Sequence, residues 1–187
     1  MERDFEDRAR ALWTIGHSTR PWEEFVGMLH AAGIAVLADV RRFAGSRRNP
    51  QFSGETMARA LPEAGIEYLP MPDLGGRRPA RKDSLHTAWR NASFRGYADY
   101  MDSHEYQAAR ARLAGIAGER RTAVMCAEAM WWQCHRSLIS DDFKADGWTV
   151  IHLMAPGRSE EHPYTSAARI VEGRLDYSRP GEQATLL

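Results

Sequence analysis

ALWTIGHSTRPWEEFVGMLHAAGIAVLADV, residues 11–40, contains two short apolar runs on either side of a segment with helical periodicity. The runs 11–18 and 34–40 are typical of strands, and the second is apolar until Asp39. Pro21 opens the segment between them, and its apolar residues recur at helical spacing up to Gly33. A strand, a helix and a second strand in this order predict a parallel pair joined by a crossover helix.

The rest of the chain repeats this alternation. Further strands are predicted at 66–71, 122–127 and 148–154, and further helices at 53–65, 97–103, 105–118 and 134–147, with Pro62 expected to end or distort the last turn of its helix. The sequence therefore predicts an α/β fold, a single small domain with a mostly parallel open sheet of about five strands and helices on both faces. The pattern assigns no structure to the extension at 156–187.

Length and composition restrict the class of protein. A chain of 187 residues is long enough for one core, so one domain is expected over 1–187. The chain has no apolar run of about 18 residues, and its start, MERDFEDRARALW, lacks the apolar core of a signal peptide. We therefore expect a soluble, cytoplasmic protein with no membrane partner, and its two cysteines fit a reducing compartment.

The basic residues are almost all arginine. Because only Lys82 and Lys144 are lysines, 23 of the 25 basic residues are arginines, and 25 acidic residues balance them. A zero net charge argues against a protein that coats polyanions, and a biased base composition of the gene would also explain the arginines. Their clustering in loop-like sequence nevertheless outlines a surface for a small anionic ligand or nucleic acid, formed by Arg41, Arg42, Arg47, Arg48, Arg77, Arg78, Arg81 and Lys82.

Polar residues follow the predicted strands where each strand ends. In open parallel sheets ligands bind outside the carboxyl ends of the strands, so these residues are expected to share one edge. They are His17, Ser18, Asp39, Arg41, Cys126 and Glu128. Structural interpretations stay open: Asp39 can pair with an arginine, His17 can be a satisfied polar residue, and Ser18 or Thr19 can cap the following helix.

The stretch VMCAEAMWWQCHRSLI, residues 124–139, holds both cysteines. Cys134 is predicted to begin a helix, where the dipole and the neighbouring His135 and Arg136 would favour a thiolate. Cys134 is therefore predicted to be the more activated thiol, with Cys126 as a resolving partner or a second contact.

Two other interpretations of the cysteines compete with thiol chemistry. Zinc or iron could bind at Cys126, Cys134 and His135 with a remote ligand, although the spacing differs from the close CxxC pairs of zinc ribbons. Alternatively, both cysteines are buried core side chains. The adjacent Trp131 and Trp132 are interpreted as core or pocket wall.

Five separated motifs, TIGHST, DVRRFAGSRRNPQF, LGGRR, FRGYADYM and CAEAMWWQCHRSLI, resemble a prokaryotic family, the domain-of-unknown-function family 488. The resemblance runs from about Trp13 to about His152 and implies a small α/β fold in a cytoplasmic bacterial protein. It implies no reaction. The family's pattern of a cysteine, a glutamate and a later Cys-His-Arg is met here by Cys126, Glu128, Cys134, His135 and Arg136.

Two hypotheses of function follow. In the first, the chain is an enzyme-like domain that acts on an anionic, nucleotide-related substrate. Cys134 is the nucleophile or redox thiol, Glu128 or a histidine carries the proton, and Arg41, Arg136 and the loop arginines hold the anion. In the second, the chain is a non-catalytic module that binds nucleic acid or another anion, with structural cysteines.

Overall fold

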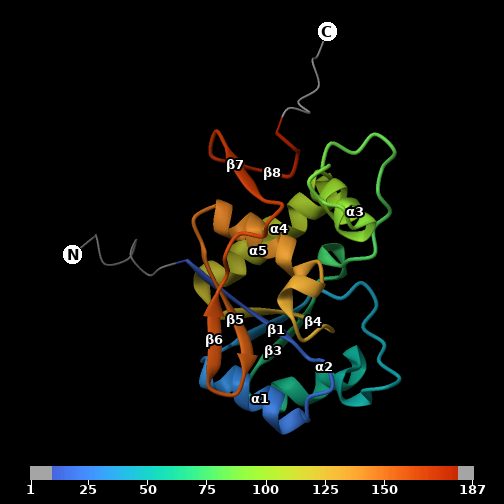
Figure 1. Cartoon of the computed structure of the whole chain (residues 1–187). Coiled ribbons are helices and arrows are strands. Elements are labelled where there is room, and N and C mark those ends of the chain that lie inside the picture. The colour runs from blue at the N-terminus through green and yellow to red at the C-terminus, as the bar shows by residue number, and fades with distance from the viewer. Residues whose placement is uncertain (1–9, 181–187) are drawn as a thin grey trace, which may run out of the picture.

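The computed structural model describes residues 10–180, and these form a single α/β domain of three layers (Figure 1). The expectation that the chain starts without a signal peptide concerns residues 1–9, which lie outside the described residues. The end of the extension, residues 181–187, lies outside them too. Within residues 10–180, no helix is long and apolar enough to cross a membrane.

The central sheet has six strands in the order β3-β2-β4-β1-β5-β6. Five are parallel, as the alternation of strands and helices predicts. They are β1 (Ala11–Gly16), β2 (Val36–Asp39), β3 (Glu67–Pro70), β4 (Thr122–Cys126) and β5 (Thr149–Ala155). The sixth, β6 (Arg158–Glu161), comes from the unassigned extension and pairs antiparallel to β5.

Helices cover both faces of the sheet, as predicted (Figure 1). α1 (Trp22–Ala31) and α2 (Gly54–Glu63) pack on one face, and α3 (Ala92–Met101), α4 (His104–Glu119) and α5 (Arg136–Ala145) pack on the other. Pro62 is the second-last residue of α2, which ends as its position predicts. Three short 3-10 turns stand in the loops: η1 (Pro50–Phe52), η2 (Pro72–Leu74) and η3 (Trp131–Gln133).

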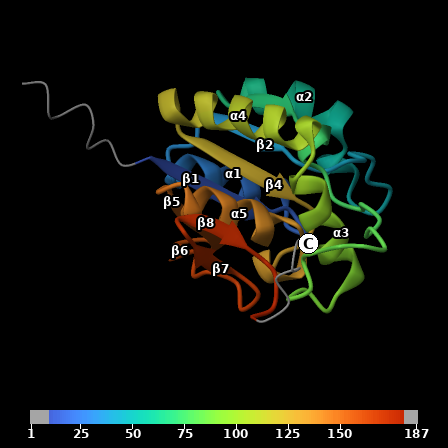
Figure 2. The same cartoon turned by 90° about the horizontal axis from the view of Figure 1, so that it is seen from above.

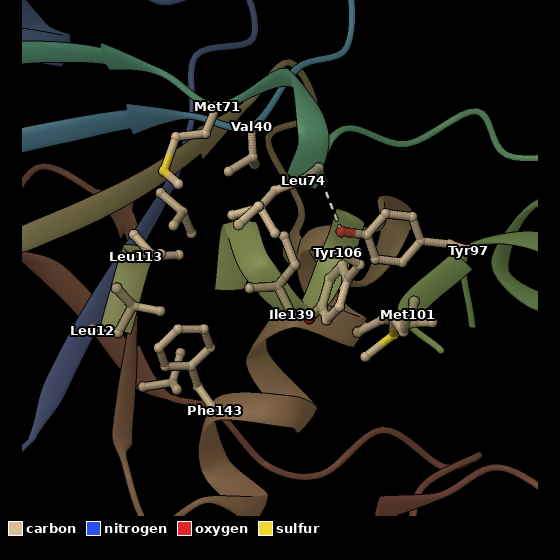
Figure 3. Close-up of a cluster of buried hydrophobic side chains, with 14 of the residues drawn as sticks. Leu12, Val40, Met71, Leu74, Tyr97, Met101, Tyr106, Leu113, Ile139 and Phe143 are labelled. Atoms are coloured by element: carbon tan, nitrogen blue, oxygen red, sulfur yellow. Dashed lines mark hydrogen bonds between the residues drawn. The ribbon is translucent and has the colours of Figure 1, made fainter. Parts of the chain in front are cut away.

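The larger core cluster lies under α3, α4 and α5 (Figure 3). Leu12 and Val40 reach it from the sheet, and Ile139 and Phe143 reach it from α5. At its rim, the buried Tyr97 of α3 donates its hydroxyl to the carbonyl oxygen of Leu74 at 2.7 Å. This hydrogen bond fixes α3 against the loop after β3, beside the carboxyl ends of the strands.

Two helices begin at other residues than the sequence predicts, and a side-chain cap explains one of them. α3 begins at Ala92 rather than 97, since the side chain of Asn91 accepts hydrogen bonds from two amides of its first turn. α1 uses neither Ser18 nor Thr19 as a cap: its N-cap is Pro21, and Ser18 adopts a left-handed turn at φ 47°. α5 begins at Arg136, two residues later than predicted.

The extension forms a small hairpin, β7 (Arg169–Val171) and β8 (Arg174–Asp176), which lies on the α5 side of the domain (Figures 1 and 2). α5 contacts β8 directly. The extension therefore completes both the sheet, through β6, and the helical layer, through the hairpin.

Candidate functional site

The carboxyl ends of β1, β2 and β4 are joined by backbone hydrogen bonds. The amide of His17 donates to the carbonyl oxygen of Cys126 at 3.0 Å, and the amide of Val40 donates to that of Met125 at 3.0 Å. The predicted strand-end residues therefore lie at one edge of the sheet, next to the start of α5.

The two cysteines meet at this edge. Their Sγ atoms lie 2.9 Å apart, well beyond the disulfide bond length of about 2.05 Å, so they are two free thiols in hydrogen-bond contact. Both are buried, with 2% of Cys126 and 8% of Cys134 exposed. Cys134 Sγ also accepts from the amide of Arg136 at 3.4 Å, and Cys126 Sγ lies 3.6 Å from the carbonyl oxygen of Glu128, to which its protonated thiol donates.

Arg136 is buried beside this pair. Its Nη2 donates to the carbonyl oxygens of Glu128 and Ala129 at 3.1 and 3.2 Å, and its buried Nε has no hydrogen-bond partner within residues 10–180. Among the described residues no carboxylate lies within ion-pair distance of its guanidinium. A buried cation without a counterion is costly, and a thiolate on the neighbouring pair would supply that charge.

The electrostatics favour Cys126 as that thiolate. Burial alone would raise the pKa of Cys126, but the hydrogen bond from Cys134 and the charge of Arg136 outweigh it and lower the pKa to about 7. Burial, together with the hydrogen bond to Cys126 and its negative charge, raises the pKa of Cys134 well above its usual value. These directions are opposite to the prediction that Cys134 is the more activated thiol, which stays a prediction, because the two sulfurs titrate as one coupled pair.

A cavity of about 250 Å³ opens onto the two sulfurs. Its cationic lining includes Arg42 and Arg77, and its aromatic wall comes from Phe43, Phe94 and Tyr97. The other residues that line it are Arg41, Gly76, Ser93, Cys126, Ala127, Glu128, Gln133, Cys134 and His135. Thiols, cations and aromatic rings thus line one cavity that is open to solvent.

A larger hollow of about 550 Å³ lies between α4, α5 and the β8 hairpin. Arg110 in its wall is already paired, with Asp142 at 3.3 Å and with Asp146 at 2.9 Å. The smaller cavity is the better candidate site, since it brings two thiols together with two arginines that form no ion pair within residues 10–180.

Asp39 and Arg41 form a buried two-point ion pair. Arg41 Nε donates to Asp39 Oδ1 at 2.8 Å and Nη2 donates to Oδ2 at 2.6 Å, while the hydroxyl of Tyr68 donates to Oδ2 at 2.6 Å. These contacts therefore support the structural interpretation of Asp39, in which it pairs with an arginine. Arg41 borders the cavity, but its Nε and Nη2 already donate to Asp39, so few of its N–H groups remain for a ligand.

His17 and Ser18 stand behind this ion pair rather than in the cavity. His17 donates from Nδ1 to the carbonyl oxygen of Ser18 at 2.9 Å, and its Nε2 accepts from Arg41 at 3.2 Å. Its ring stacks on Phe52 at 4.6 Å, and burial lowers its pKa. Neither residue is among those that line the cavity, so their sites lie beside it, and their role stays a prediction.

The remaining arginines divide by position. Arg42 and Arg77 are exposed at the cavity, whereas Arg47 and Arg48 are exposed outside it. Arg78 caps the turn after η2 through Gly75 and Pro72 and stacks over the ring of Tyr100 at 3.7 Å. Two of the predicted anion ligands, Arg42 and Arg77, thus line the same cavity as the cysteines, and Arg42 Nη1 donates to the carbonyl oxygen of Arg77 at 2.9 Å.

His135 lines the cavity as a neutral acceptor. Its Nε2 donates to the carbonyl oxygen of Val40 at 2.9 Å, so Nδ1 carries the lone pair. Burial lowers the pKa of His135 to about 4, which makes it a weak base at neutral pH. Gly76 lies against this ring, and a β-carbon there would stand 2.9 Å from Nδ1.

The two cysteines gain no third metal ligand from the described part of the chain. Across residues 10–180, no three histidine, cysteine, aspartate or glutamate side chains cluster closely enough to hold a metal ion. His135 Nε2 is committed to Val40, and Glu128 is exposed at the mouth of the cavity. The two sulfurs alone are soft donors, of the kind that soft cations prefer.

A second buried polar network, which sequence reasoning missed, lies behind the site. Thr14 donates to His152 Nδ1 at 2.6 Å, His152 Nε2 donates to His162 Nδ1 at 2.9 Å, and His162 Nε2 donates to Asp141 at 2.8 Å. Trp131, which stands between the cysteines, stacks on His152 at 4.7 Å. The sequence pattern did not predict this network, because His162 belongs to the extension at 156–187, to which the pattern assigns no structure.

Fold and site together define an α/β protein with a paired-thiol cavity at the carboxyl edge of a parallel sheet. A family model described as "Domain of unknown function DUF488" matches residues 21–142, about two thirds of the chain. The chain belongs to this family. The match begins after TIGHST and ends before His152, so it is shorter at both ends than the predicted resemblance. No curated protein and no solved structure matches the chain.

Proposed function

We propose that this protein is a cysteine-dependent enzyme that acts on a small anionic substrate in the paired-thiol cavity. One observation carries the proposal: a thiol pair, 2.9 Å apart, faces the same 250 Å³ cavity as two exposed arginines that have no ion pair within residues 10–180. Such an arrangement combines a nucleophile with groups that attract and orient an anion.

Each residue of the site has a distinct role in this proposal. Cys126 is the nucleophile, Cys134 donates its S–H to the thiolate, and buried Arg136 supplies the compensating charge. Arg42 and Arg77 bind the anionic group of the substrate, and Glu128 carries a proton at the cavity mouth. A reducing compartment such as the cytoplasm would keep both thiols available.

The cavity would hold only part of a large ligand. A volume of about 250 Å³ lies just below the range of about 300–1,000 Å³ that is usual for drug-sized ligands. It would accept an anionic head group, and aromatic Phe43 and Phe94 would lie against a flat or apolar part of the same molecule. A nucleotide-related substrate would therefore enter by one end only.

Alkylation with two matched reagents tests the proposal. Iodoacetate is anionic and iodoacetamide is neutral, and both transfer a small group to a thiolate. We expect Cys126 to react at neutral pH and to prefer iodoacetate relative to a free thiol in solution, because the cavity arginines attract the anion. The preference should fall as salt is added.

Two arginine variants provide the matched control. R42A and R77A should each reduce the preference for iodoacetate several-fold, whereas R47A, whose side chain is exposed outside the cavity, should leave it unchanged. An equal preference in all three variants would contradict anion binding in the cavity. A Cys126 that resists both reagents in the folded, chelator-treated protein would contradict the nucleophile.

Exposed arginines on the same loops favour a second candidate, a module that binds nucleic acid. Arg42, Arg47, Arg48 and Arg77 are exposed and form no ion pair within the described residues. In that case affinity for a labelled oligonucleotide should fall steeply with salt, and R47A should weaken it as much as R42A. Zinc or iron held by the two sulfurs would instead appear as stoichiometric metal in the purified protein, lost together with either cysteine.

A further inference from the structure

We propose that Cys126 and Cys134 form a reversible disulfide when a small peroxide enters the cavity, so that oxidation switches the nucleophile off. The proposal rests on the part of the proposed function that makes Cys126 a thiolate, and it needs no substrate. Disulfide formation would shorten the Sγ–Sγ distance of 2.9 Å by about 0.9 Å.

The fold already holds the two sulfurs together. Cys126 ends β4, and Cys134 follows η3, whose Trp131 is buried and donates its Nε1 to Glu160 at 2.6 Å. On the other side, Ser137 Oγ donates to the carbonyl oxygen of Cys134 at 2.9 Å. Because folding has already closed this loop, bond formation requires little further loss of chain entropy.

The oxidation balances with a peroxide as the only oxidant. The Cys126 thiolate attacks one peroxide oxygen, an S–O bond forms, the O–O bond breaks, and the leaving hydroxide takes a proton to become water. Cys134 sulfur then attacks the sulfenic sulfur. The S–S bond forms, the S–O bond breaks, and the departing hydroxide takes the proton of the Cys134 thiol. Two electrons pass from the thiol pair to the peroxide.

The burial of the two sulfurs should make them react faster with small oxidants than with bulky ones. Only 2% of Cys126 and 8% of Cys134 is exposed, and the approach runs through a cavity of about 250 Å³. Hydrogen peroxide, with two heavy atoms, fits this route. A bulky disulfide such as oxidised glutathione must align its own sulfur with Cys126, which the cavity walls hinder.

Arg136 makes the disulfide easy to reduce. In the reduced protein its buried guanidinium lies beside the thiol pair, and no carboxylate of residues 10–180 pairs with it. Disulfide formation removes the thiolate and leaves this cation buried without a counterion, which penalises the oxidised state. Restoring the thiolate restores the charge balance, so the bond should be reversible.

The test uses the full chain, fully reduced and treated with chelator, then exposed to hydrogen peroxide near neutral pH. We expect both thiols to disappear together, with a loss of two hydrogens in the intact mass and full recovery on adding dithiothreitol. In C134S, Cys126 should stop at the sulfenic acid and be trapped by dimedone. In C126S, neither product should form, and oxidised glutathione should react with the wild type at least tenfold more slowly than peroxide.

Other outcomes would overturn the proposal. Stepwise addition of oxygen to Cys126 while Cys134 stays alkylatable would show that Cys134 does not resolve the sulfenic acid. Equal rates with peroxide and oxidised glutathione would contradict selection by the cavity. The result is separable from the proposed function: a disulfide without iodoacetate preference would contradict only the anionic substrate, and iodoacetate preference without a disulfide would contradict only the switch.

Discussion

The carbonyl oxygen of Glu128 packs so closely on Gly16 that a β-carbon on Gly16 would stand 1.7 Å from it. Arg136 donates to the same oxygen at 3.1 Å from the opposite element, α5. The turn that follows Cys126 is therefore clamped between the end of β1 and the start of α5. The position of Cys126 relative to Cys134 depends on this clamp.

Replacing Gly16 with alanine should open the clamp. Because the obstacle is backbone rather than a movable side chain, the turn must shift, and we expect G16A to lose about 1–3 kcal/mol of stability. Cys126 alkylation at neutral pH should slow as well. Urea unfolding and the alkylation rate measure the two effects. G115A is the matched control: nothing lies near the new methyl group in α4, so it should gain about 0.5–1 kcal/mol.

Asp39 should prove to be structural. D39N removes the charge that Arg41 and Tyr68 contact and leaves a buried guanidinium unpaired, so we expect a loss of about 3–5 kcal/mol in urea unfolding. Y68F removes one hydrogen bond and should cost about 1–2 kcal/mol. In the fraction that stays folded, Cys126 should keep its alkylation rate. A stable D39N protein with an unreactive Cys126 would assign Asp39 to the chemistry instead.

Acid should destabilise the protein through its buried histidines. Burial lowers the pKa of His135 to about 4 and that of His152 to about 2, below the unfolded value of about 6.5. The unfolded chain therefore binds more protons below pH 6.5. Stability is fully present above that pH and falls as the pH drops toward 4, by about 1.4 kcal/mol per pH unit for each histidine.

The variant H135Q isolates one of these contributions. Its amide can still donate to the carbonyl oxygen of Val40, but it does not titrate. The free energy of unfolding, measured with urea from pH 7 to pH 4.5, should fall less steeply with pH than in the wild type. Below pH 6.5 the difference in slope should be about 1.4 kcal/mol per pH unit. H104Q, at an exposed position of α4, should keep the wild-type slope. An unchanged slope in H135Q would mean that His135 is not buried in neutral form.

The parallel core was predictable because each strand is a short apolar run and each helix keeps its periodicity between strong breakers such as Pro21 and Gly33. The carboxyl-edge rule then brought His17, Asp39 and Cys126 to one edge. The sixth strand was not predictable, because RSEE in β6 is polar and gains its structure by pairing with β5. Tertiary pairing, not local propensity, decides such an edge strand.

Two features of the site also could not be predicted from the sequence. Which sulfur keeps the proton depends on burial and on Arg136, an environment that sequence order does not encode. The arginines divide in a similar way: Arg41 and Arg136 are buried with their partners, while Arg42 is exposed at the cavity and donates to the carbonyl oxygen of Arg77. The direction of each side chain follows from packing that only the folded chain supplies.

Asp141 should anchor the extension to the domain. It accepts four hydrogen bonds: from His162 Nε2, from the amide and hydroxyl of Thr165, and from the hydroxyl of Tyr177. All four donors belong to the extension, and Asp141 itself lies in α5 with no exposed surface. A fully buried carboxylate with four donors is stable only while all of them stay in place.

D141N should therefore release the extension. The amide group of asparagine turns a donor toward hydroxyls that need an acceptor, so we expect a loss of at least about 3 kcal/mol, against about 1 kcal/mol for Y177F, which removes a single bond. Hydrogen exchange should show amides of 158–177 losing protection before those of β1 and β4. D146N is the matched control, because its exposed pair with Arg110 should contribute at most about 1 kcal/mol. If 158–177 stays as protected in D141N as in D146N, then β6 and the hairpin are held by the sheet alone, and the His152–His162–Asp141 chain does not stabilise them.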